Sequence, residues 1–348
     1  MASISGSYTE STESHDGVEY TRLRATSGRV LIVLEDGETF ENYLLDQTQA
    51  GAYFSIVSQT SWDATPPSSY TLRNIGYDGH VPNDGRAPLV LSCTDEALAE
   101  NIYLGDGVPE YPHTGNTWND YPGAIRSSLA HSGHLIWRGV TTANWVDNAM
   151  YCSPPASPGT GNGSFLVENC WSENNQISCY RFGSTTTIRN SYGRTQSGDH
   201  RVLWAQTNRN VSSYDLNVDN TILAGHGNGI RAITHRDEAN VILDANSQYT
   251  GENGTGSVSG GQLVDDPPRL TPDDVGAPTS ALAAATGQVA DPDMPDPEPN
   301  PPDKTDTLAV ETRTARDIST TGARLRGDLT GIDADEVDVY FEWRQVDE

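Results

Sequence analysis

Lysine is almost absent from this sequence of 348 residues, and so are long apolar runs. Lys304 is the single lysine, against 20 arginines. The longest strongly apolar run, residues 30–34, has five residues, whereas a helix needs roughly 20 to cross a bilayer. The first 25 residues contain no basic region followed by an apolar stretch, so they do not resemble a secretory signal. We therefore expect no membrane insertion and no Sec-dependent export.

Cysteine is scarce too. The four cysteines show neither C-x-x-C spacing nor histidines at zinc-ligand intervals, and they are Cys93, Cys152, Cys170 and Cys179. No calcium loop of the Asp-x-Asp-x-Asp-Gly type occurs either. We expect no metal site and no cofactor. Two possibilities stay open: a single disulfide, and structural Na⁺, K⁺, Mg²⁺ or Ca²⁺ ions at acidic surface positions.

The charge is strongly negative, with 48 acidic side chains against 21 basic ones and a formal net charge of −27. Such a chain repels the phosphate backbone and has no basic stripe, which excludes nucleic acid as a partner. Self-repulsion of this size destabilises a compact state unless salt screens it. The avoidance of lysine therefore favours adaptation to concentrated salt over an ordinary acidic surface. In this respect the composition resembles that of haloarchaeal proteins and of proteins from their viruses.

The prolines are unevenly distributed, since ten of the 20 lie between residues 265 and 305. This segment combines them with paired acids and few bulky apolar residues, so it cannot build a core of its own. We expect residues 265–307 to be a Pro/Asp-rich extended linker between a large N-terminal domain and a short C-terminal module.

Short apolar segments that end in Asn or Gly recur along the N-terminal part of the chain. The turns are spaced by 27, 38, 30, 21 and 30 residues and lie at Asn74, Asn101, Gly139, Asn169, Asn190 and Asn220. Asparagine tolerates the left-handed backbone of a sharp turn, and its amide can bond to an asparagine stacked above it. We therefore expect a structural ladder of Asn74, Asn101, Asn169, Asn190 and Asn220.

A second family of strand-like segments is interleaved with the first, centred on Met150, Cys179, Leu203 and Ile230. Each segment alternates apolar and polar residues over four to six positions, the period of a half-buried strand. Helical periodicity is nearly absent, and residues 95–101 are the one short helix candidate. The pattern predicts an all-β solenoid of parallel strands, with equivalent side chains stacked about 4.8 Å apart.

These segments also carry a family resemblance. The stretches GRVLIVLEDGETFENYLLDQ, YTLRNIGYDG, AENIYLGDG, HSGHLIWRGV, DNAMYCS, VENCWSENN and YRFGSTTTIRN resemble the pectate-lyase-like proteins of haloarchaea and their tailed viruses. The resemblance implies a right-handed parallel β-helix over residues 28–264, preceded by an N-terminal arm or attachment segment at residues 1–27. It says little about activity, because this fold carries lyases, hydrolases, adhesins and phage tailspikes alike.

Residues 308–348 resemble the first strands of a fibronectin type III-like module. Val337, Val339, Phe341 and Trp343 alternate as a strand, and Trp343 has the character of the core tryptophan of such a sandwich. About 40 residues are present where a complete sandwich needs roughly 100. We expect a partial immunoglobulin-like β-sandwich, which either was cut or is completed by strands of another chain.

Charged clusters on the surface of the coil are the candidates for chemistry. The Gly-His-Gly sequence around His226 resembles a polygalacturonase motif, but the upstream acid motifs of that family are missing. Asp199, His200 and Arg201 precede a strand with Trp204, so they either bind a sugar carboxylate or form an ordinary charged turn. We assign no catalytic residue; an enzyme would use Asp199, His200, Arg201 and His226. A glycan-binding site would use Asp199, Arg201 and Trp204.

Together these features favour a virion structural protein on the surface of a haloarchaeal tailed virus. It would be a capsid decoration, spike or turret, or a tail spike or fibre, assembled in the host cytoplasm without a leader. The expected partners are other virion proteins, further copies of the chain with a trimer favoured, and a host glycan or surface-layer glycoprotein. Two alternatives stay open: a polysaccharide lyase or glycoside hydrolase acting on host surface glycans, and a secreted extracellular haloarchaeal protein. The missing catalytic motifs favour a protein that is not an enzyme.

Overall fold

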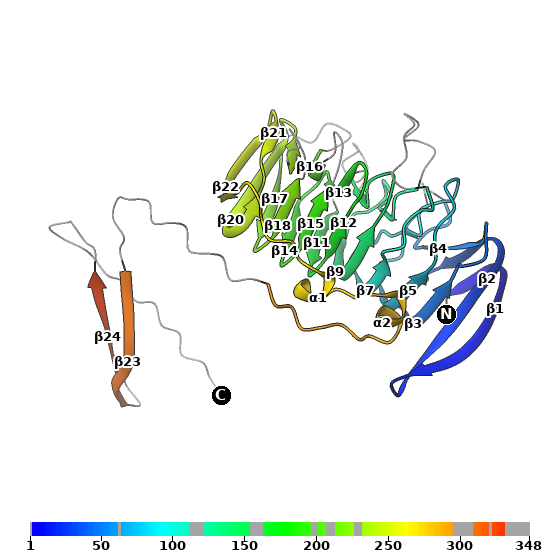
Figure 1. The fold of residues 1–348 in the computed structure, drawn as a ribbon, viewed down its shortest axis with the longest axis horizontal. Helices are drawn as coiled ribbons and strands as arrows, with labels where there is room; N and C mark the ends of the chain where they lie inside the picture. The colour runs from blue at the N-terminus through cyan, green and yellow to red at the C-terminus, as the bar shows by residue number, and fades with distance from the viewer. Residues whose placement is uncertain are drawn as a thin grey trace. The chain divides into compact units, whose positions relative to one another are not determined.

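The computed structural model describes residues 2–61, 64–110, 122–153, 163–195, 201–206, 213–225 and 232–294, and the backbone of 309–319 and 322–330. The chain divides into two compact units, Met1–Pro295 and Asp296–Glu348. The regular secondary structure of the described residues consists of strands apart from two short helices, which confirms the all-β prediction (Figure 1). No helix in these ranges is long and apolar enough to cross a bilayer.

In the first unit, the chain passes repeatedly through three columns of parallel strands (Figure 1). The first column contains β2 (Val18–Val33), β4 (Tyr53–Val57), β6 (Leu89–Val90), β8 (Ile125–Arg126), β10 (Met150–Cys152), β13 (Ser178–Phe182), β16 (Arg201–Ala205), β19 (Ile233–His235) and β21 (Glu252–Gly254). The second contains β3 (Glu38–Asp46), β5 (Tyr70–Asp78), β7 (Glu96–Leu104), β9 (His134–Ala143), β11 (Ser164–Glu168), β14 (Thr186–Arg189), β17 (Tyr214–Asp219), β20 (Ala239–Tyr249) and β22 (Ser257–Leu263). The third contains residues 21–24 of β2 and the C-terminal ends of β3, β5, β7, β9, β20 and β22, together with β12 (Trp171–Glu173), β15 (Tyr192–Thr195) and β18 (Ile222–Gly225).

The strand register corrects two details of the sequence interpretation. Met150 pairs with Tyr180, Tyr180 with Leu203, and Leu203 with Ile233. The expected centre Cys179 was therefore wrong by one residue, and the expected centre Ile230 lies outside the described residues. The helix candidate at residues 95–101 was also wrong: Ala97 and Ala99 are buried, alternate with the more exposed Glu96, Leu98 and Glu100, and belong to strand β7.

The core between the columns is built from rows of stacked apolar side chains. One row of the second column lies in register from strand to strand and is at most 4% exposed: Leu72, Ala99, Trp137, Val167, Ile188, Val218 and Leu243. In this row Trp137 stacks directly on Ala99, so a small residue accommodates the largest side chain. Close packing of this kind fixes the register, since a slip by one residue would turn every buried side chain outward.

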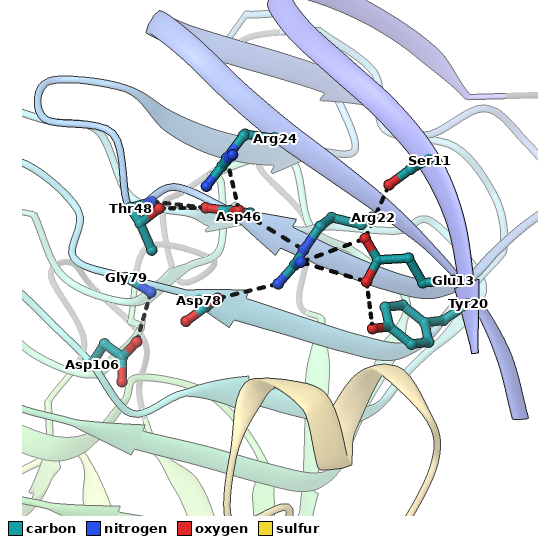
Figure 2. Close-up of polar contacts among 10 residues, drawn as sticks. All are labelled: Ser11, Glu13, Tyr20, Arg22, Arg24, Asp46, Thr48, Asp78, Gly79 and Asp106. Atoms are coloured by element: carbon teal, nitrogen blue, oxygen red, sulfur yellow. Dashed lines mark hydrogen bonds and ion pairs between the residues drawn. The ribbon is translucent and has the colours of Figure 1, made fainter. Parts of the chain in front are cut away.

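An antiparallel hairpin precedes the parallel columns. Strand β1 (Ser3–His15) pairs with β2 along its whole length. The Arg22 guanidinium lies 3.4 Å from the Glu13 carboxylate of β1 and 3.8 Å from the Asp78 carboxylate of β5. The Arg24 guanidinium lies 3.0 Å from the carboxylate of the buried Asp46 (Figure 2). Strand β2 runs without a break across the expected boundary at residues 27 and 28 and continues into the columns, so the hairpin is joined to them by backbone and by ion pairs.

The expectation of an extended linker was wrong for residues 265–294, which we call the strap. The strap contains α1 (Pro272–Val275) and α2 (Ala281–Ala285) and lies along the third column (Figure 1). Trp171 Nε1 donates to the Leu270 carbonyl at 2.9 Å, and Thr141 Oγ1 donates to the Pro278 carbonyl at 2.6 Å. The composition argument failed because the strap needs no core of its own: its small apolar side chains pack on an outward apolar row of the column.

Glycine is required where the strap approaches the strands most closely. A Cβ atom at Gly76 would lie 1.8 Å from the Ala281 carbonyl oxygen. Gly139 occupies a turn position with φ of 60°, and a Cβ there would lie 2.9 Å from Asn101 Oδ1 and 3.2 Å from the Gly276 carbonyl oxygen. The neighbouring asparagine turn and the strap together therefore favour glycine at this turn of the repeat.

The second unit contains an antiparallel pair of strands, β23 (Ala309–Ser319) and β24 (Gly322–Thr330). The strand expected to contain Val337, Val339, Phe341 and Trp343 lies outside the described residues. The immunoglobulin-like module thus stays a prediction.

Candidate functional site

The asparagine turns form hydrogen-bonded stretches at the corner between the second and third columns. Their left-handed φ values range from 44° to 64° and occur at Asn42, Asn74, Asn101, Asn169, Asn190 and Asn220. The amide of Asn74 donates to Asn42 at 2.8 Å, Asn101 donates to Asn74 at 3.0 Å, and Asn220 donates to Asn190 at 3.0 Å. Asn169 Oδ1 is buried and has no partner among the described residues. The bonded amides support the turns, in two separate stretches on either side of Asn169.

A ladder of alternating charge runs beside this corner, one residue earlier in each coil. We call it the charge ladder, and its register positions are Glu41, Arg73, Glu100, Arg138, Glu168, Arg189 and Asp219. Arg138 contacts Glu100 at 3.2 Å and Glu168 at 2.7 Å, and Arg189 contacts Glu168 at 2.6 Å. Burial raises the pKa of Glu168, but the arginine contacts outweigh it and the net pKa is lowered. These arginines are neutralised within the chain. The sequence carries this signal as an alternating sign of charge in the residue before each turn.

A different set of arginines lies on the outer face of the first column. Consecutive outward positions of β8, β10, β13 and β16 are Arg126, Tyr151, Arg181 and Trp204, which we call the arginine–aromatic row. Adjacent strands of a sheet are 4.7–4.9 Å apart, so the row extends over about 14 Å. It therefore presents cationic and aromatic groups in alternation along one line.

Arg181 is the centre of this row. Its guanidinium carbon lies 4.2 Å from the ring centroid of Tyr151 and 4.0 Å from that of Trp204. Arg181 is only 8% exposed, and burial lowers its pKa. Cation–π contacts of about 0.5–2 kcal/mol each offset part of the cost of burying the charge. Arg201, from the start of β16, adds a second guanidinium at 4.2 Å from Trp204.

A buried carboxylate anchors the other end of the row. Asp147 accepts from Arg126 Nη2 at 2.8 Å and from Asn148 Nδ2 at 2.6 Å. Burial raises the pKa of Asp147, and Arg126 opposes that rise. Because Asp147 is held in these contacts, it positions Arg126 and is not a free acid or base.

The structure covers only part of the candidate site predicted from sequence. Asp199, His200 and His226 lie outside the described residues. Arg201 and Trp204 are described, and they contact each other on the outer face of the first column. The sequence interpretation missed Tyr151 and Arg181, because their proximity to Trp204 depends on the strand register and no local motif encodes it.

The buried thiols and His131 do not offer nucleophilic chemistry. All four cysteines are free and buried, which answers the open disulfide question, and burial raises the pKa of Cys93 to about 12. His131 Nδ1 accepts from the Cys93 backbone amide at 3.2 Å, and its Nε2 lies 3.2 Å from the Ser164 carbonyl. Burial lowers the pKa of His131 to about 4. A protonated Cys93 and a neutral His131 in the core are structural groups.

The comparisons give no relative from which residue roles could be transferred. Neither the protein-family models, nor the curated proteins, nor the solved structures contain a match to the chain. Within the described ranges, no group of three or more His, Cys, Asp or Glu residues is arranged to hold a metal ion. The arginine–aromatic row is therefore the candidate site that the geometry itself provides.

Proposed function

We propose that this protein is a structural component of a virion surface that binds an acidic glycan of the host, in the setting of a haloarchaeal tailed virus. We further propose that its three columns are the faces of a right-handed parallel β-helix. The repeated passage through the columns and the asparagine corners support this fold. The sequence composition and the resemblance to β-helix proteins support the viral, high-salt setting.

The observation that carries the binding proposal is the stacking of Arg181 and the more exposed Arg201 against the Trp204 ring. A planar guanidinium donates paired hydrogen bonds to a carboxylate or sulfate, and aromatic rings pack against the C–H faces of sugar rings. In a chain of net charge −27, an outward row of this composition differs from the surrounding surface. A polyanionic sugar chain lying across the strands would meet these groups in succession.

A comparison with the charge ladder supports binding at the arginine–aromatic row rather than at the arginines of the ladder. Arg73, Arg138 and Arg189 each have a glutamate partner within 3.2 Å. An external carboxylate would have to displace that partner, whereas Arg181 and Arg201 lie against aromatic rings that a sugar ring can also contact. The ladder arginines thus provide matched control positions.

The test is binding of immobilised acidic polysaccharides, with neutral dextran as the comparison, at low salt and at about 1 M salt. We expect wild type to bind a polyuronate or a sulfated polysaccharide, and Arg201→Gln and Trp204→Ala to weaken binding by about tenfold, roughly 1.4 kcal/mol. Arg181→Gln should weaken it further, provided that its urea unfolding curve shows a folded protein. The control Arg189→Gln should bind as wild type does.

Equal weakening by Arg189→Gln and Arg201→Gln would refute the site, and equal binding of dextran would refute the charge recognition. The enzyme alternative is tested with the same samples, by following reducing ends and the ultraviolet absorbance of unsaturated uronates. Turnover that is lost in Asp199→Asn and His200→Ala would replace binding by catalysis. Mass spectrometry of purified virions and of culture supernatant separates the virion assignment from a secreted protein.

A further inference from the structure

A surface cavity lies at the N-terminal end of the arginine–aromatic row. Its volume is about 720 Å³, within the range of small-molecule sites. Val57 and Val90, which line it, precede Arg126 in the same outward line of register positions, and Arg126 lines it as well. The cavity and the row are therefore continuous, and Arg126 belongs to both.

The charges around the cavity do not balance. Arg29, Arg86 and Arg126 line it together with one carboxylate, Asp84. Arg126 is neutralised by Asp147 at 2.8 Å. Arg29, Arg86 and Asp84 form no ion pair within the described residues, so among the described lining residues two positive charges face one negative charge. One further negative charge would neutralise the site.

The walls also suit a sugar. Thr60 and Ser61 supply hydroxyl groups on one side, and Leu31, Val57 and Val90 supply apolar surface. A monosaccharide has this same mixture of hydroxyls and C–H faces. Its hydroxyls would find hydrogen-bond partners while the ring packs on the aliphatic side chains.

We propose that this cavity binds one sugar unit bearing a single negative charge, either a carboxylate or a sulfate ester. It would be the end subsite for the acidic glycan on the arginine–aromatic row, and in this respect the inference rests on the proposed function. A phosphate ester carries nearly two charges at pH 7 and would overcompensate the site. A neutral sugar would leave the excess positive charge without a partner.

The test is titration of the full-length protein with methyl glucuronide, a glucose sulfate ester, a glucose phosphate ester and neutral methyl glucoside, followed by calorimetry or NMR. We expect the carboxylate or the sulfate sugar, or both, to bind at least about tenfold more tightly than methyl glucoside. The comparison of these two probes identifies the anionic group. Arg29→Gln and Arg86→Gln should each reduce that affinity by about tenfold. The control Arg73→Gln, in the charge ladder, should leave it unchanged.

Three results would overturn the cavity assignment: no binding of either monoanionic sugar, equal binding of methyl glucoside, or unchanged affinity in the Arg29→Gln/Arg86→Gln double variant. Tighter binding of the phosphate ester than of both monoanions would overturn the charge argument. If acidic polysaccharides bind wild type while the monosaccharides do not, the cavity inference fails and the proposed function stands. If the monosaccharides bind and no polysaccharide does, the proposed function fails.

Discussion

Reversing one charge in the charge ladder should destabilise the fold in a salt-dependent way. Arg138 lies between Glu100 and Glu168, with nitrogen to oxygen distances of 3.2 and 2.7 Å. The substitution Arg138→Glu would place three carboxylates in consecutive coils. Arg138→Gln removes the same two ion pairs without adding repulsion, so it is the matched control.

The expected loss in the free energy of unfolding follows from the distances between these charges and from their exposure to solvent. Two unit charges 4 Å apart interact by about 4 kcal/mol at an effective dielectric constant of 20. Arg138 is 37% exposed, whereas Glu100 and Glu168 are 19% and 13% exposed, so solvent reduces each pair to about 1 kcal/mol. We expect Arg138→Gln to lower the free energy of unfolding by about 2 kcal/mol and Arg138→Glu by about 4 kcal/mol at low salt. The difference between the two variants isolates the repulsion.

Urea denaturation measures this effect, because urea is uncharged and guanidinium would itself screen the charges. The screening length falls to about 3 Å at 1 M salt. The gap between the two variants should therefore shrink by more than half when salt is raised to about 1 M. If Arg138→Glu is no less stable than Arg138→Gln at low salt, or if salt leaves the gap unchanged, the ladder is not an electrostatic device.

Three further predictions concern the strap and the core. Gly76→Ala should displace α2, because the new Cβ would lie 1.8 Å from the Ala281 carbonyl oxygen. Limited proteolysis should then cut within residues 265–294 faster than in wild type. Unchanged cleavage would contradict the close approach. His131 should make folding pH-dependent, since burial lowers its folded pKa to about 4 while the unfolded value is about 6.5. Its contribution is fully present above pH 6.5 and is lost as the pH falls through 4, by about 3 kcal/mol at most. Urea midpoints of wild type should therefore drop more steeply over this interval than those of His131→Gln, and parallel curves would exclude the effect. The four thiols should be unreactive toward a disulfide reagent in the native protein and should all react in urea, because burial raises the pKa of Cys93 and Cys170 to about 12; native reactivity of any thiol would show that it is accessible.

Much of the local structure could be predicted from the sequence, because it depends on a few neighbouring residues. Asparagine adopts the left-handed turn where most other side chains would be strained, so the turns at Asn74, Asn101 and Asn190 follow from residue type and spacing. Alternation of apolar and polar residues predicts strands, which excluded nearly all helix. The alternating sign of the residue before each turn was also present in the sequence.

The sites depend on contacts that no local pattern contains. Arg181 meets Tyr151 and Trp204 because connections of unequal length bring three parallel strands into register. The strap folds back on the third column because Leu270 finds Trp171, which lies 99 residues away in the chain. Residue type and spacing thus determined the turns and the strand pattern. Only the tertiary structure decided which side chains share a face, because that depends on loop lengths and on packing between distant segments.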